Sequence, residues 1–144
     1  MLRSYLSQLE EAKMAARGSI LLVEPDEQLR QSRALVLSIL NLPIQQASGY
    51  SEVCSIPAST IFSIIAISLN QREVEAAKIA TYARMQWAAA KILLLGRLME
   101  DFDDPLYDEI VDPNFNPAAL VEAARRLLKD LGANPPQQSE SYAL

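Results

Sequence analysis

Polar side chains follow each of four apolar segments in this chain. In chain order they are two acids, a hydroxyl, a cation and a further acid: Glu24 with Asp26, Ser68, Arg97 and Asp112. Neighbouring carboxylates are typical ligands of a divalent cation, and a serine hydroxyl becomes a nucleophile when a base activates it. Either chemistry requires these side chains to meet, so the elements that carry them decide what is feasible.

The residue inventory excludes much of this chemistry. The sequence contains no histidine, which removes the commonest general base and the commonest metal ligand. Ser68 therefore has no imidazole to activate it. The single cysteine, Cys54, cannot form an internal disulfide, and its apolar segment favours a small core or near-surface side chain without chemistry. We expect no catalytic residue, no metal site and no cofactor, and hence a protein that is not an enzyme.

Length and charge narrow the class of partner. A chain of 144 residues is one domain by size, large enough to bury a single core. Its net charge of -5 argues against a nucleic-acid partner, because phosphate binding normally needs a basic surface. No apolar stretch is long enough to cross a bilayer, and the first residues do not resemble a secretion signal. We expect a cytoplasmic protein that binds neither nucleic acid nor membrane.

Continuous apolar runs predict a parallel β-sheet. Ser19–Val23, Ile61–Ile67 and Lys91–Leu95 are apolar on both faces, as strands buried on both sides are. Ile44–Ala47 and Asp108–Val111 are more polar or shorter and predict edge strands. In such sheets ligands lie beyond the carboxyl ends of the strands.

Helical periodicity fills the intervals between these runs. The predicted helices span Asp26–Leu40, a short segment from Gly49, Gln71–Trp87, and a closing helix from Pro117 that Gly132 caps. The segment Leu98–Tyr107 carries a cluster of acids that we interpret as a solvated face, because it lacks the donor spacing of a calcium loop.

The predicted helix at Asp26–Leu40 has more apolar surface than it needs to pack on one face of a sheet. Leu29, Val36 and Leu40 form one stripe, which would suffice for packing on the sheet. The apolar surface extends beyond that stripe at four further residues, Leu35, Leu37, Ile39 and Leu42. The surplus indicates a second contact, either with the amino-terminal segment or with another chain.

The amino-terminal segment has a helical stripe of its own. Its apolar residues alternate in spacings of three and four: Leu2, Tyr5, Leu9, Ala12 and Ala16. This stripe is a dimer seam, a brace on its own domain or a frayed end; if it is a dimer seam, deleting residues 1–17 converts a dimer into a monomer. We divide the chain into this helix (1–18), an α/β domain (19–131) and a mobile polar tail (132–144).

This alternation of strands and helices resembles the receiver domain of bacterial response regulators. The similarity covers residues 19 to 131 and includes an acidic turn after the first strand and an Xaa-Pro step after the last, Asp112-Pro113. It implies an α/β fold with a doubly wound, five-stranded parallel sheet of flavodoxin-like order 2-1-3-4-5, here with an extra amino-terminal helix. In that family a carboxylate pair binds magnesium and an aspartate accepts phosphate.

The positions that carry phosphorylation in the family differ here. The magnesium-binding pair matches Glu24 and Pro25, with Asp26 next in sequence, and the phosphoacceptor aspartate matches Ser68. The sensing hydroxyl and the small residue after it match Leu95 and Gly96.

The resemblance also implies a lysine where Asp112 stands, although the following Pro113 is kept. With Glu24, Asp112 would then place two negative charges where a phosphate should bind, and like charges repel the anionic donor. We hypothesise that Arg97 lies over this end of the sheet and pairs with Glu24 or Asp112. The alternative is an exposed Arg97 beside a solvated acidic rim.

These differences favour a receiver-like domain that is not phosphorylated and acts in two-component-type signalling by binding a protein partner or by forming a homodimer. Besides the surfaces already described, the contact residues that we expect are Tyr107 and Glu109, the latter nearest to the family's aromatic switch position. Two alternatives remain. One is a working but atypical receiver with magnesium on Glu24 and Asp26, and the other is a small α/β nucleotide-binding protein or enzyme.

Overall fold

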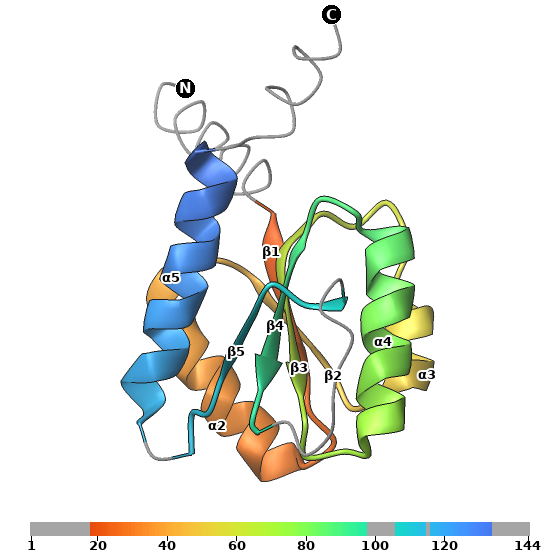
Figure 1. Cartoon of the computed structure of the whole chain (residues 1–144), viewed down its shortest axis with the longest axis horizontal. Coiled ribbons are helices and arrows are strands. Elements are labelled where there is room, and N and C mark those ends of the chain that lie inside the picture. The colour runs from red at the N-terminus through yellow and green to blue at the C-terminus, as the bar shows by residue number, and fades with distance from the viewer. Residues whose placement is uncertain (1–17, 98–105, 115, 134–144) are drawn as a thin grey trace, which may run out of the picture.

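Five parallel strands form the centre of the fold (Figure 1). The computed structural model describes residues 18–97, 106–114 and 116–133. The predicted order is confirmed, since the strands lie in the order β2-β1-β3-β4-β5. In chain order they are β1 (Ser19–Val23), β2 (Ile44–Ala47), β3 (Phe62–Ser68), β4 (Lys91–Leu95) and β5 (Glu109–Val111).

Strand β3 lies at the middle of the sheet, and all seven of its residues are buried. It pairs in parallel with β1 on one side, where Leu21 is opposite Ile65, and with β4 on the other, where Ile92 is opposite the same residue. The two strands predicted as edges, β2 and β5, are at the edges. All five carboxyl ends therefore face the same rim of the sheet.

Helices cover both faces of this sheet (Figure 1). They are α2 (Glu27–Leu37) with a following 3-10 turn η1 (Ser38–Leu40), α3 (Tyr50–Cys54), α4 (Glu73–Gln86) and α5 (Pro117–Ala133). Alternate residues of β1 enter opposite halves of the core. Leu21 and Val23 pack with the α3 and α4 layer, while Ile20 and Leu22 pack with α2 and α5.

The predicted boundaries were wrong in a few places. The helix expected over Asp26–Leu40 ends at Leu37, and a 3-10 turn takes its last residues. Ile61 lies outside β3 and is exposed, because the strand begins at Phe62 and runs through Ser68. The closing helix continues past Gly132, where we expected its cap, to Ala133.

Of the predicted stripe, Val36 of α2 and Leu40 of η1 are half-buried against the core, but the most deeply buried side chains of α2 are other residues. Leu37 is fully buried in the core, although we assigned it to the surplus apolar surface. The side chains of Arg33 and Ala34 are buried beside it. Leu35 and Ile39 do face solvent, with exposed fractions of 73% and 58%, so the surplus exists at those two positions.

Several expectations fall on residues outside the described ranges. These are the amino-terminal stripe with Leu2, Tyr5 and Leu9, the acidic cluster within 98–105, and the tail from residue 134. Within the described ranges, no helix has both the length and the apolar character that a membrane span requires.

Candidate functional site

Three of the polar residues predicted at the carboxyl ends of the strands line one pocket: Ser68, Arg97 and Asp112. It has a volume of about 160 Å³ and opens beyond the ends of β3, β4 and β5. Its lining is mostly polar, with two cations, one acid, a hydroxyl and two amides: Arg33, Arg97, Asp112, Ser68, Asn70 and Asn114, beside Leu69, Leu95 and Gly96. Of the six polar residues, the sequence analysis identified Ser68, Arg97 and Asp112 and omitted the other three, including Arg33.

Glu24 lies directly after β1, next to this pocket, and is completely buried. Its Oε1 accepts a hydrogen bond from Ser68 Oγ at 2.7 Å and another from Arg33 Nη1 at 2.9 Å. Its Oε2 accepts the backbone N–H of Asp26 at 3.0 Å. Both carboxylate oxygens are therefore engaged by groups of the protein itself.

Arg33 supplies the positive charge that pairs with Glu24. Helix α2 carries this side chain inward, where only 7% of it is exposed. Its Nη2 also contacts Asn114 Oδ1 at 3.4 Å, which links α2 to the loop after β5. Burial lowers the pKa of the Arg33 guanidinium, while Glu24 and Asp112 act in the opposite direction. Because an arginine in a protein stays protonated, the pair consists of two buried, opposite charges.

The Ser68 hydroxyl has no free hydrogen-bonding capacity. It donates to Glu24 and accepts from Arg33 Nη1 at 3.2 Å and from the backbone N–H of Asn70 at 3.0 Å. A hydroxyl has one proton and two lone pairs, so all three are used. Glu24 is a base that we did not pair with Ser68 from sequence. The buried oxygen nevertheless has no lone pair directed at an incoming phosphorus atom.

Asp112 and Arg97 form the outer rim of the pocket. Arg97 Nε lies 3.6 Å from Asp112 Oδ2, and the arginine side chain is 80% exposed. The hypothesis that Arg97 pairs with one of the two carboxylates is confirmed for Asp112 and wrong for Glu24, which Arg33 neutralises. The expected clash between two uncompensated acids does not occur, because a cation accompanies each.

The residues present do not fit a magnesium ion. Pro25 offers no side-chain oxygen, and both oxygens of Glu24 are engaged. Asp26 instead stabilises the amino end of α2, because its Oδ1 accepts the N–H of Leu29 at 2.9 Å and caps the helix. In the part of the chain that the structure describes, no three acidic or cysteine side chains are grouped as ligands. The Arg33 guanidinium occupies the carboxylate of Glu24, which a metal ion would need as a ligand.

The cap on α2 predicts the effect of removing Asp26. We expect Asp26→Ala to lower the free energy of unfolding by about 1 kcal/mol, because one backbone N–H at the helix start loses its acceptor. Gln28→Ala, two residues further on and exposed, is the matched control and should change stability by less than about 0.5 kcal/mol. Urea unfolding of both variants measures this, and equal losses would show that the cap contributes nothing.

The other positions of the family pattern lack a polar side chain at the pocket. Leu95 is buried and lines the pocket, but its side chain is apolar. Gly96 has a φ of +133° and donates its N–H to the carbonyl of Val111 at 2.8 Å, which ties β4 to β5. Pro113, two residues after the end of β5, is also buried. These residues lie at the carboxyl ends of β4 and β5 and provide no hydroxyl that could sense a phosphoryl group.

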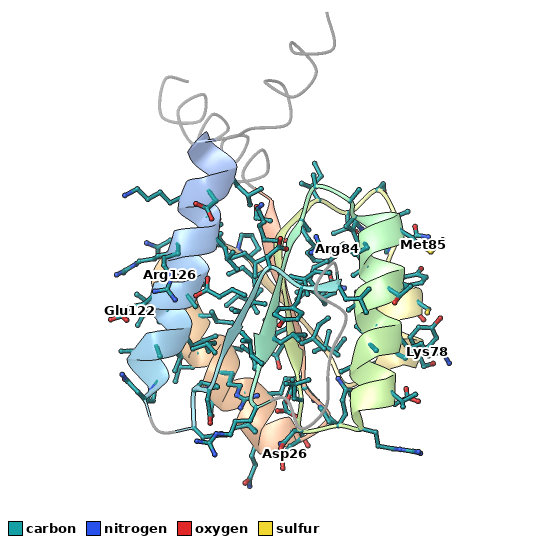
Figure 2. All side chains as sticks on the ribbon, in the orientation of Figure 1. Asp26, Lys78, Arg84, Met85, Glu122 and Arg126 are labelled. Atoms are coloured by element: carbon teal, nitrogen blue, oxygen red, sulfur yellow. The ribbon has the colours of Figure 1, made fainter. Side chains whose placement is uncertain are left out.

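The two residues near β5 that we expected to contact a protein partner, Tyr107 and Glu109, have different surroundings. Tyr107 is half-buried and packs against the core under α4. Glu109 pairs with Arg126 of α5, whose pKa is raised chiefly by that hydrogen bond (Figure 2 labels Arg126). The charge of Glu109 is therefore already matched within the domain, which weakens it as a contact for a basic partner.

Sequence reasoning missed Arg33, although a signal was present. Arg33 lies four residues after Leu29 and three before Val36, so it falls within the apolar stripe assigned to the first helix. A charge on a buried stripe requires an opposite charge nearby. The buried Glu24 at the end of the preceding strand was the available partner.

Comparison with known proteins identifies the fold. No protein-family profile matches the chain, and no curated protein is similar to it in sequence. Among solved structures, the response regulator TrrA of Thermotoga maritima, in complex with Mg²⁺ and BeF, superposes with a TM-score of 0.66 and 22% identity, over 76% of this chain and 98% of that one.

Two further structures agree. A CheY-like receiver domain protein of Methanospirillum hungatei gives a TM-score of 0.70 at 15% identity, covering 81% of this chain and 97% of that one. TrrA bound to the histidine kinase ThkA gives 0.66 at 23% identity, covering 77% and 98%. The chain therefore has the CheY-like receiver fold, with the predicted strand order.

Proposed function

We propose that this chain is a receiver-like signalling domain that works through protein–protein contacts and is not switched by phosphoryl transfer. Its fold is that of receiver domains. The observation that carries the proposal is the buried network of Glu24, Arg33 and Ser68, which occupies the place of the phosphorylation chemistry. We also propose a cytoplasmic location, because the fold supports a role in two-component-type signalling.

The site lacks each of the groups that phosphoryl transfer needs. That reaction needs an anionic oxygen nucleophile, a divalent cation and a cation that neutralises the product. Ser68 is a neutral alcohol with its hydrogen bonds satisfied, and Glu24 is held by Arg33. Asp112 stands where the family has a cation and is itself paired with Arg97.

A protein is the partner that we propose. TrrA, which has the same fold, has been solved in complex with the histidine kinase ThkA, so this fold supports protein recognition. A second copy of the chain is the alternative partner. Light scattering on the full chain separates the two, because a homodimer doubles the mass.

The nucleotide-binding alternative has less support. Ligand pockets usually measure about 300–1,000 Å³. The pocket at the carboxyl ends of the strands has about 160 Å³, and its deepest cation, Arg33, is already engaged by Glu24. The turn after β1, Glu24-Pro25-Asp26, also lacks the glycines that let a backbone approach phosphates.

Phosphodonor chemistry tests the proposal directly. We expect no mass increase when the full chain is incubated with acetyl phosphate and Mg²⁺, and no thermal shift with beryllofluoride. At the described carboxyl ends of the strands, Ser68 has its hydrogen bonds satisfied and the acids are not grouped as metal ligands. A receiver domain that retains its aspartate, treated in the same way, is the positive control. A stoichiometric phosphoryl adduct on the chain, at Ser68 or elsewhere in the domain, would contradict the proposal and favour an atypical working receiver.

A further inference from the structure

The outer face of α2 presents apolar side chains in a surface that lacks charge. Leu35 and Ile39 are four residues apart, so they lie on the same side, and they are 73% and 58% exposed. The charged side chains of α2 that reach solvent are Glu27 at its start and the half-buried Arg30, which donates to the carbonyl of Glu24. The other exposed side chains from α2 through η1 are uncharged: Gln28, Gln31, Ser32, Leu35, Ser38 and Ile39. Depletion of charge around apolar side chains is typical of a surface that another element covers.

The η1 end of this face lies near the amino ends of the strands, where β1 begins. Helix α2 starts beyond the carboxyl end of β1 and returns along the sheet, so η1 ends near the amino ends of the strands (Figure 1). Pro43, three residues after η1, accepts a hydrogen bond from the N–H of Ile20 at 2.9 Å. Ile61, 61% exposed, accepts the N–H of Ser19 at 3.0 Å at the same end of the sheet.

Gly18 fixes the point at which the preceding residues leave the domain. It is buried and has a φ of +81°, a conformation that glycine adopts without strain. A Cβ here would lie 2.8 Å from Ser63 Oγ and 3.2 Å from the Ile61 side chain. Residues 1–17 therefore join the domain beside the amino ends of the strands, and η1 ends near the same place.

We infer that residues 1–17 bind in cis to the outer face of α2, over Leu35 and Ile39. The sequence gives this segment one apolar stripe, from Leu2 through Tyr5 and Leu9 to Ala16, which is the shape that a second helix would need. As a helix, seventeen residues would span about 25 Å at 1.5 Å per residue, enough to follow α2 and η1 along their length. Tethering at Gly18 favours cis binding, because a linked segment reaches an effective concentration of the order of millimolar.

Charge substitutions on the described side of this contact test the inference. In the full chain, the Leu35→Glu/Ile39→Glu variant should raise hydrogen–deuterium exchange of the amides in residues 2–16 by about tenfold or more, because docking is lost. Both positions are exposed, so the domain itself should keep its melting transition. Light scattering should give the mass of a monomer for the parent chain and for the variant.

The matched control is Val74→Glu/Met85→Glu on α4, which covers the other face of the sheet (Figure 2 labels Met85). These side chains are at least as exposed on average, at 69% and 77%, and their substitution should leave exchange in residues 2–16 unchanged.

Two results would overturn the inference. One is exchange in residues 2–16 that the α2 variant leaves at the parent rate. The other is a parent chain with twice the monomer mass that the α2 variant converts to a monomer, which would assign the face to a second copy. Neither result bears on the phosphodonor experiment, so the two proposals fail separately.

Discussion

Arg33→Ala is expected to lower the free energy of unfolding by about 3–5 kcal/mol, because it leaves a buried carboxylate without its partner. Glu24 is completely buried, and the Arg33 guanidinium at 2.9 Å is the cation paired with it among the described residues. Since small domains are stable by only about 5–15 kcal/mol, a loss of this size is a large part of the total. Urea unfolding followed by circular dichroism measures it.

Arg97→Ala is the matched control for this prediction. It also removes an arginine from the same pocket, but Arg97 is 80% exposed and pairs with Asp112 at 3.6 Å. Exposed ion pairs contribute about 0–1 kcal/mol, so this variant should be close to the parent in stability. A loss below about 1 kcal/mol for Arg33→Ala would show that Glu24 is not held as a charged group.

The double variant Glu24→Gln/Arg33→Met separates the charge from the packing. Replacing both members of a buried pair removes the desolvation of two charges at once, and such replacements are often neutral or stabilising. We therefore expect the double variant to recover most of the stability that Arg33→Ala loses. A double variant as unstable as the single one would locate the loss in packing against Leu37 and Ala34 instead.

Ser68→Asp, which introduces the residue type that the resemblance to receiver domains implies at this position, is expected to cost about 3 kcal/mol at neutral pH, because it adds an uncompensated buried charge. Ser68 Oγ lies 2.7 Å from Glu24 Oε1, and both side chains are completely buried. Two carboxylates would then share the single guanidinium of Arg33. Ser68→Ala, which loses hydrogen bonds without adding charge, should cost about 1–2 kcal/mol.

The cost of Ser68→Asp should depend on pH in a defined direction. Neighbouring carboxylates raise the pKa of one member of the pair above its unfolded value. Such a group contributes stability that is complete below the unfolded pKa, about 4, and is lost as the pH rises through the folded pKa. The deficit relative to the parent should therefore grow between about pH 5 and pH 8.

Removing the second carboxylate provides the corresponding control. Ser68→Asp/Glu24→Gln leaves one carboxylate facing Arg33, as in the parent, and should regain stability and lose the pH dependence. A Ser68→Asp variant with the stability of the parent at pH 7 would contradict the argument. It would show that this end of the sheet tolerates a phosphoacceptor, which would weaken the case against phosphorylation in the natural chain.

The sequence alone determined the architecture. Runs such as Ile20–Val23 and Ile92–Leu95 are apolar on both faces, and only a strand covered on both sides buries them, so a parallel sheet with two helical layers followed. The strand order came from the resemblance to receiver domains, and the structure confirms it. The positions of Glu24, Ser68 and Asp112 at one rim also followed, because parallel strands end on the same side.

Only the tertiary structure decided how the charges at that rim are paired. Helix periodicity gives the stripe that a residue shares with its neighbours, but not the angle at which the helix packs on the sheet. That angle puts Leu37 and Arg33 inside and leaves Leu35 and Ile39 outside. Arg33 and Ser68 are 35 residues apart and Arg33 and Asn114 are 81 apart, so their contacts depend on the folded chain and not on local sequence. A buried charge must find its partner in space, and that partner is fixed only when the helix docks on the sheet.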